Sequence, residues 1–405
     1  MTKKLTRIIV FLLLLLLCAS SYLAYVLYIN HTTGFLDTKN NQIIYKTRDG
    51  VQLFGLQEID GDTYYFSQDE GYMHRGFLMQ NHEQYYFDDQ GRMAHGLTSI
   101  GQRYAYFDKS GKMIKNKYQE VERNKLKQTS YFDENGYMVI GSKVINGIPE
   151  YFDENGKHVF NKNYLLEGVN DILNRYSGNV RIYFKDLTSQ STFTIHDELS
   201  FYPCCMIKVP VLAAIYDEIY KGNINYEQYK YQIEKMITIS DNTSYNEMMY
   251  ALGGNDPIKG CELVNAYVKK IGLTDTYVGH GLRPGYGYFT TNTVNKTSPK
   301  DLGLLFEKLY RKEIVNKQAS HDMLELLKRC YDPDEIQAGL PKDIPFAHKT
   351  GVAYANYHDG GIIFTPHRDY ILIIFSDQVQ GYNAMMQEIS KFIYDYIALL
   401  PNGHV

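Results

Sequence analysis

Two adjacent cysteines stand close to a lysine in the middle of the chain, in the stretch YPCCMIKVPVL at residues 202–212. Cys205 precedes Lys208 by three positions, and an apolar run, VPVLAAIY, follows. On a helix this gap places both side chains on one face, near the N-terminus, whereas Cys204 lies off that face. Thiols beside lysines and helix N-termini have lowered pKa values and react as thiolates. Cys205 is therefore a candidate nucleophile, with a buried inert thiol as the alternative, and Cys204 is expected to pack.

Two polar tripeptides follow at greater distances. Ser240-Asp241-Asn242 lies within MITISDNTSYNEMM, and Lys349-Thr350-Gly351 opens a predicted strand. Any one tripeptide arises by chance in a chain this long about once in ten to twenty cases at average composition. Two of them in this order, after a helix start with the x-x-x-Lys pattern, are far less frequent. Their order and context therefore indicate one particular protein family.

The elements around these motifs predict a single antiparallel sheet. Helical periodicity over 163–176 precedes two strands, 181–187 and 191–197, and helices dominate from Met206 to Lys328. Three more strands are expected at 346–353, 360–366 and 370–377, followed by an amphipathic helix at 384–400. The order predicts a sheet built from both ends of this domain, with the terminal helices on one face and an inserted helical lobe.

From about residue 165 to 400 the chain resembles the class A β-lactamase and penicillin-recognising superfamily, which is defined by S-x-x-K, S-D-N and K-T-G. The segments TSPKDLGLLFEKL and AGLPKDIPFAHKTG, at 297–309 and 338–351, add to the resemblance. It implies an α/β (α+β) fold, an antiparallel sheet flanked by helices. It also implies a covalent acyl-enzyme mechanism that uses no cofactor and no metal.

The resemblance assigns a role to each motif residue. Cys205 takes the place of the nucleophile, Lys208 that of its base, and Ser240 relays protons to the leaving group. Lys349 supplies positive potential. Substrate contacts are implied for Asn242, Thr350, Gly351 and Val352: Asn242 holds the acyl amide, Thr350 contacts a carboxylate, and the N–H groups of Cys205 and Val352 form the oxyanion hole.

Three features depart from the family pattern. Cysteine replaces serine at position 205, and only 35 positions separate Cys205 from Ser240, which shortens the helical lobe. No Asp or Glu lies between Asp275 and Asp301, where the family's deacylating glutamate is expected, and His280 is the one base there that titrates near neutral pH. These departures weaken a β-lactamase interpretation. The three motifs, together with the repeats described below, favour an acyl-enzyme hydrolase or transferase of the cell envelope, acting through Cys205 on a peptidoglycan stem peptide or another wall ester or amide. The alternatives are a genuine class A β-lactamase and a catalytically decayed wall-polymer-binding surface protein.

Residues 55–160 contain an internal repeat. Aromatic pairs ending in Phe66, Phe87, Phe107, Phe132 and Phe152 recur at spacings of 21, 20, 25 and 20, each before a D-x-x-G-type turn. Each unit predicts a strand, this turn and a second strand, and stacked units would form a β-hairpin solenoid.

The array resembles the choline- and glucan-binding cell-wall repeats of Gram-positive surface proteins, which implies binding to a wall polymer or peptidoglycan. The chain has 38 Tyr and no Trp, and Leu56, Phe77 and Leu97 stand where the family has tryptophan. Choline cages rely on Trp and Tyr, so this composition argues against choline. A plain spacer is the alternative.

The N-terminus predicts export. Lys3, Lys4 and Arg7 precede an uncharged run from Ile8 to Ile29, long enough to span a bilayer with the N-terminus in the cytoplasm. A cleaved signal peptide, which would make the protein secreted, is the alternative.

The expected organisation is a signal anchor at 1–30, repeats at 31–160 and a catalytic domain at 161–405, on a single-pass membrane protein whose bulk is extracellular. With a net charge of −4 and no long basic block, nucleic-acid binding is not expected.

Overall fold

The computed structural model describes residues 2–38, 40–196, 201–366 and 368–400. The chain divides into two compact units, Met1–Val159 and Phe160–Val405, and each is described by itself.

The second unit is built on one five-stranded antiparallel sheet in the order β15-β14-β18-β17-β16. Its strands are β14 (Asn179–Asp186), β15 (Thr192–Ile195), β16 (Phe346–Ala353), β17 (Asn356–Ile363) and β18 (Tyr370–Asp377). The strands come from both ends of the unit, as the sequence predicts. The bounds of β16 and β18 coincide with the predicted ranges. Both are runs in which nearly every residue is buried, typical of strands covered on both faces.

β17 begins four residues earlier than predicted. Tyr354 and Ala355 adopt positive φ angles of 51° and 65° and join β16 directly to β17 as a two-residue hairpin turn. Gly, Asn and Asp are the usual residues in such turns, so neither side chain signals this one.

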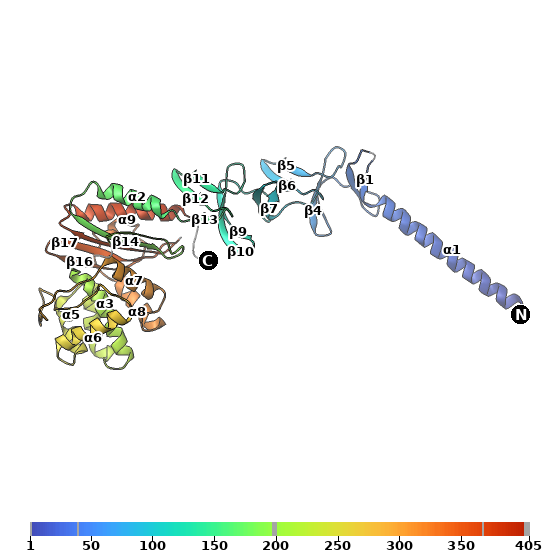
Figure 1. The fold of residues 1–405 in the computed structure, drawn as a ribbon. Helices are drawn as coiled ribbons and strands as arrows, with labels where there is room; N and C mark the ends of the chain where they lie inside the picture. Colours follow the sequence, from blue (N-terminus) through green and yellow to red (C-terminus); the bar gives the residue numbers. More distant parts are fainter. Residues whose placement is uncertain (1, 39, 197–200, 367, 401–405) are drawn as a thin grey trace. The chain divides into compact units, whose positions relative to one another are not determined.

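Helices cover both faces of the sheet (Figure 1). α2 (Lys162–Leu173) and α9 (Tyr382–Leu399) pack together on one face, and α7 (Pro299–Tyr310) packs on the other. The remaining helices form the inserted lobe: α3 (Lys208–Tyr220), α4 (Tyr226–Thr238), α5 (Asn242–Leu252), α6 (Pro257–Lys270) and α8 (Lys317–Leu327). The 3-10 turn η1 (Cys204–Ile207) leads into α3 and packs on β16, and η2 (Ile336–Gly339) packs on α9. The predicted arrangement of terminal helices and inserted lobe is confirmed.

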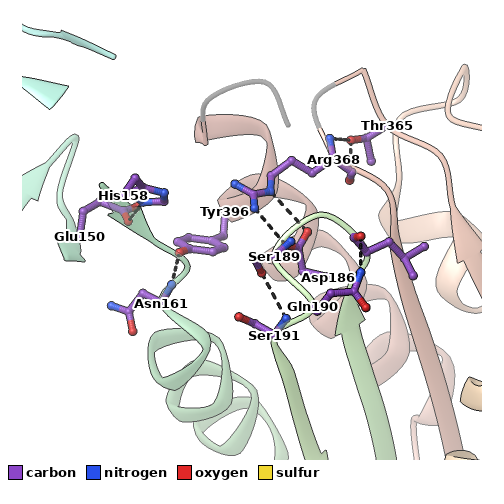
Figure 2. Close-up of polar contacts among 11 residues, drawn as sticks. Glu150, His158, Asn161, Asp186, Ser189, Gln190, Ser191, Thr365, Arg368 and Tyr396 are labelled. Atoms are coloured by element: carbon purple, nitrogen blue, oxygen red, sulfur yellow. Dashed lines mark hydrogen bonds and ion pairs between the residues drawn. The ribbon is translucent and has the colours of Figure 1, made fainter. Parts of the chain in front are cut away.

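A buried ion pair joins the end of β14 to the turn between β17 and β18. Arg368 donates from Nη2 and Nε to the two carboxylate oxygens of Asp186, at 3.0 and 3.3 Å (Figure 2). The Asp186 carboxylate also accepts the backbone N–H of Ser189, and the guanidinium lies 5.5 Å from the ring centre of Phe160. Both charged side chains are almost completely buried.

Replacing Arg368 by methionine is expected to destabilise the second unit by about 3–5 kcal/mol, because it leaves the Asp186 carboxylate buried without its counter-charge. Urea unfolding followed by circular dichroism measures the change. Lys391→Met is the matched control, since Lys391 pairs with Asp395 on the exposed side of α9. Equal shifts for the two variants would contradict the prediction.

The first unit begins with α1 (Thr2–Thr32), followed by short antiparallel hairpins (Figure 1). Among the described residues one helical stretch, Val10–Ile29, is long and apolar enough to cross a membrane, with a mean hydropathy of 2.4. The strands are β1 (Gly34–Asp37), β2 (Ile43–Lys46), β3 (Gly55–Ile59), β4 (Asp62–Phe66), β5 (Gly76–Gln80), β6 (Glu83–Phe87), β7 (Gly96–Ile100), β8 (Arg103–Phe107), β9 (Lys117–Arg123), β10 (Leu126–Phe132), β11 (Gly141–Ile145), β12 (Ile148–Phe152) and β13 (His158–Val159).

The hairpin turns differ from the predicted ones. β5 and β6, for example, are joined through Asn81 and His82, both at positive φ, so the main turn precedes the aromatic pair. In the last repeat β13 pairs with β12, and elsewhere, as at Phe87 and Met93, a single antiparallel bridge follows the predicted D-x-x-G turn. There the side chain of Asp88 accepts the backbone N–H groups of Gln90 and Arg92, and the same contacts recur at Asp108, Asp133 and Asp153.

Neighbouring hairpins are linked by the methionine that follows every D-x-x-G-type turn of the repeats except the last. The backbone N–H of Met93 donates to the carbonyl of Thr63 in the preceding hairpin, and Met113 and Met138 make equivalent bonds. The side chain of Met93 also packs against Gly111, where any Cβ would collide with it. Glycine is therefore needed in these turns both for its positive φ and for this contact.

Candidate active site

Cys205 and Lys208 meet at the entry to the helical lobe. Cys205 lies in the 3-10 turn η1 and Lys208 is the first residue of α3, so the predicted α-helical start is shifted by one turn. Residues three apart are aligned on a 3-10 turn, and the predicted proximity is kept. Lys208 Nζ donates to Cys205 Sγ at 3.3 Å.

The neighbouring thiol has a different environment. Cys204 is 3% exposed, and its Sγ lies 4.0 Å from the carbonyl oxygens of Tyr202 and Ala353. Burial raises the pKa of Cys204 to about 12. At neutral pH it is therefore a protonated, packed side chain, which separates it chemically from Cys205.

Lys208 is fully buried and is surrounded by acceptors. Its ammonium donates to the carbonyl oxygen of Ser240 at 2.6 Å and to Asn242 Oδ1 at 2.7 Å, and Ser240 Oγ lies at 3.2 Å. Burial, together with the positive charge of Lys349, lowers the pKa of Lys208 to about 8, although the Cys205 sulfur acts in the opposite direction. An amine with this pKa can accept and return a proton near neutral pH.

For Cys205, neighbouring charges and hydrogen bonds together affect the pKa more than burial does. Burial raises it, but the charges of Lys208 and Lys349 and hydrogen bonds from Ser240 and Lys208 outweigh burial, so that the pKa falls below its ordinary value. Asn242 Oδ1 lies 3.6 Å from the sulfur. The sulfur of Cys205 therefore has the electrostatic surroundings of a thiolate.

A capped helix start holds the second motif in place. The carboxylate of Asp241 accepts the backbone N–H and the hydroxyl of Ser244 at 2.7 and 2.6 Å, which fixes the N-terminus of α5. Ser240, just before this cap, has a positive φ of 56°. The cap thus presents the groups of Ser240 and Asn242 to Lys208, while Asn242 Nδ2 donates to the carbonyl of Pro284 at 3.1 Å.

The third motif lies on β16, whose backbone passes close to the nucleophile. A Cβ at Gly351 would stand 2.9 Å from Cys204 Cβ and 3.0 Å from the backbone nitrogen of Cys205. Lys349 is completely buried, and its ammonium donates to the carbonyl of Thr350 at 3.1 Å and to Cys330 Sγ at 3.8 Å. Thr350 is buried as well, whereas Val352 is 53% exposed. The structure thus brings the three motifs together around Cys205.

Gly351→Ala is expected to destabilise the second unit by about 1–3 kcal/mol, because the added methyl group meets backbone atoms that cannot turn away. The shift of β16 from η1 should also slow alkylation of Cys205. Urea midpoints and alkylation rates measure both effects. Val352→Ala is the control for stability, since Val352 is exposed on the same strand, and equal stability of Gly351→Ala and wild type would refute the prediction.

An open pocket of about 790 Å³ adjoins these residues and was not foreseen from the sequence. Its walls include Tyr202, His280, Arg283 and Tyr354. His280 is half-buried, and its Nδ1 lies 2.6 Å from the carbonyl of Gly281, to which it must donate. Cys330, beside Lys349, was also missed as a neighbour of the site. The family resemblance pointed to the segment between Asp275 and Asp301 but not to Arg283, and nothing in the sequence connects Cys330 with position 205.

The part of the chain that the structure describes contains neither a group of metal ligands nor a disulfide. There, no three His, Cys, Asp or Glu side chains are grouped so that they could hold a metal ion. Cys261 and Cys330, which could pair outside the cell, are both free thiols.

Known proteins share this fold. A profile of the Beta-lactamase enzyme family matches residues 165–234 and 229–397, more than half of the chain. The solved structure of PBP-A aligns with 22% identity and a TM-score of 0.52, covering 58% of this chain and 97% of PBP-A. A PBP-A variant, solved as an acyl-enzyme complex with penicillin G, aligns with the same identity and TM-score over 59% of this chain and 97% of its own. A β-lactamase from Sphaerobacter thermophilus has 18% identity and a TM-score of 0.52, over 60% of this chain and 99% of its own. At these identities the structural likeness establishes the fold alone, and the predicted β-lactamase-like α/β fold is confirmed.

Proposed function

The chain belongs to the β-lactamase enzyme family, and we propose that it is an acyl-enzyme hydrolase or transferase whose nucleophile is Cys205. The observation that carries the proposal is the 3.3 Å contact between Lys208 Nζ and Cys205 Sγ, in surroundings that lower the pKa of the thiol. A decayed site would have no need to keep a buried lysine pointed at the sulfur, since burying an ammonium is unfavourable.

The proposed reaction proceeds through a thioester. The Cys205 thiolate attacks the carbonyl carbon of an ester or amide, a C–S bond forms, and the oxyanion accepts hydrogen bonds from the N–H groups of Cys205 and Val352. As the intermediate collapses, the bond to the leaving group breaks, and Lys208 returns a proton to it through the Ser240 hydroxyl. Water or an amine then attacks the thioester carbonyl and gives its proton to the neutral Lys208, and the C–S bond breaks to release the acid or amide product and the Cys205 thiolate.

The other motif residues orient the substrate in this scheme. Asn242 holds the acyl amide, Thr350 contacts a carboxylate, and Gly351 allows the strand to approach η1. Lys349 keeps the site positive. The two buried lysines lower the pKa of the Cys205 thiol and so favour its thiolate form.

The proposed substrates lie in the cell envelope, as a peptidoglycan stem peptide or another wall ester or amide. The apolar helix Val10–Ile29 supports membrane anchoring or export. The hairpins of the first unit, with their recurrent aromatic pairs and glycine turns, support a solenoid of wall-type repeats that binds a wall polymer or holds the second unit away from the membrane.

Covalent labelling tests the proposal. The full chain in detergent is incubated with a fluorescent penicillin and with acyl thioesters, and intact-mass spectrometry with peptide mapping locates the adduct. We expect one acyl group on Cys205. Because Cys18 is an exposed thiol, Cys18→Ser serves as the control variant and should be labelled to the same extent.

The result also separates the alternatives. Rapid repeated turnover of a chromogenic cephalosporin would indicate a genuine class A β-lactamase instead. A folded protein with no adduct on Cys205 from any donor would overturn the proposal and favour a non-catalytic wall-binding protein.

A further inference from the structure

The pocket beside Cys205, here called the aromatic pocket, is lined by Tyr202, His280, Arg283, Tyr288, Val352 and Tyr354, among others. Two contacts place it next to the nucleophile. Pro284, also in its wall, accepts the Asn242 side-chain amide at 3.1 Å, and Val352 follows the glycine that packs on η1. The pocket therefore lies on the side of Cys205 where Asn242 stands, the side on which the acyl group of a substrate is held.

The walls of the aromatic pocket are formed largely by ring side chains. Tyr202 and His280 are nearly parallel, at 21° and 6.1 Å between ring centres, and Tyr354 lies 6.3 Å from Tyr202. His280 in turn lies 6.2 Å from Tyr288. Tyr354 is 88% exposed and Tyr288 is 37% exposed. Exposed ring faces around a depression suit the flat face of another ring or a short apolar chain.

The charge of the aromatic pocket is positive. The guanidinium of Arg283 stacks 3.7 Å from the ring centre of Tyr288, which fixes it at the rim. In the described part of the chain Arg283 forms no ion pair, and none of the residues lining the pocket there is Asp or Glu. Lys208 and Lys349 add positive charge nearby. A stacked guanidinium offers a planar set of donors that matches a carboxylate.

We propose that the aromatic pocket selects acyl donors whose acyl group carries both a flat apolar part, held between the tyrosine rings, and a carboxylate, paired with Arg283. The inference rests on the proposed acylation of Cys205 and names the substrate class of that same site. The carboxylate recognised here is a second one, on the acyl side, and is separate from the one assigned to Thr350.

A matched pair of thioesters tests the proposal. 4-Methylphenylacetyl and 4-(carboxymethyl)phenylacetyl thioesters differ only in one carboxylate, and intact-mass spectrometry gives the rate at which each acylates Cys205 in the full chain. We expect the carboxylated donor to react about tenfold faster, the effect of one charge-assisted contact. Arg283→Gln should reduce this ratio to about two or less. Arg311→Gln, which alters a surface arginine paired with Glu307, should keep it.

The outcomes separate this proposal from the one on which it rests. Equal rates for the two donors in wild type, with Cys205 acylated by both, would overturn the selectivity alone. If neither donor acylates Cys205, calorimetry decides whether the pocket recognises anions. Wild type should then bind 1,4-phenylenediacetate more tightly than phenylacetamide, with the preference lost in Arg283→Gln, and equal affinities would overturn the proposal.

Discussion

Lys208→Met is expected to slow acylation of Cys205 at pH 7 by about 100-fold or more, which is the range for removing a positioned acid or base. Methionine has nearly the volume of lysine, so the packing of α3 is kept. The charge that lowers the pKa of Cys205 disappears, and the thiol becomes protonated and slower to attack. Stopped-flow or intact-mass kinetics with an acyl thioester measure the rate.

The same substitution also leaves the carbonyl of Ser240 and Asn242 Oδ1 without their buried donor, so a loss of stability of about 1–3 kcal/mol is expected beside the kinetic effect. Circular dichroism at the assay temperature shows whether the variant is folded. The pH dependence of alkylation separates a chemical effect from a structural one, because the pKa of Cys205 should rise in the folded variant. A folded Lys208→Met that is acylated within threefold of wild type would rule out the assigned role of Lys208.

The second large effect is expected for Cys205→Ser. A serine hydroxyl is far less acidic than the Cys205 thiol, whose pKa is lowered, and must lose its proton during attack, so acylation by thioesters should fall by about two orders of magnitude. Cys205→Ala serves as the blank and should take up no acyl group. If the serine variant instead gained a turnover that wild type lacks, Cys205 would be a substitution that has inactivated a former serine enzyme.

Some of this structure could be predicted from residues alone, because local patterns determine it. The run YILIIFSD at 370–377 is apolar and β-branched, and it forms β18 with the predicted bounds. The spacing between Cys205 and Lys208 predicted the contact between their side chains, although the local helix is 3-10 rather than α. Both features depend on neighbours in sequence.

Features that depend on tertiary packing could not be predicted. The turn at Tyr354 and Ala355 has no typical turn residue, and it forms because β16 and β17 continue their pairing up to it. The D-x-x-G turns lead to antiparallel partners as expected, since Phe87 pairs with Met93 and β12 with β13, but the hairpin turn before each aromatic pair was not predicted. The pocket around Arg283 arises from chain segments near residues 202, 283 and 354, which only the fold brings together.

The roles of the two lysines also required the fold. Burial and the mutual repulsion of Lys208 and Lys349 lower the pKa of Lys208 to about 8, and neither effect can be read from a motif. A fully buried Lys349 beside Cys330 was likewise not evident from the tripeptide that contains it. The motifs identify which residues form the site, whereas the pKa values of these residues depend on how the fold packs them.

The rate of alkylation of Cys205 as a function of pH tests most directly whether this sulfur is an activated nucleophile. The full chain is treated with iodoacetamide at a series of pH values, and peptide mass spectrometry follows Cys205, with buried Cys204 as the internal reference. Only the thiolate reacts, so the rate rises with pH through the pKa of Cys205. We predict a half-maximal rate clearly below pH ~8.5, the ordinary thiol value, and no alkylation of Cys204. A rate for Cys205 that is still rising above that pH, or no alkylation of Cys205 in the folded protein, would contradict it.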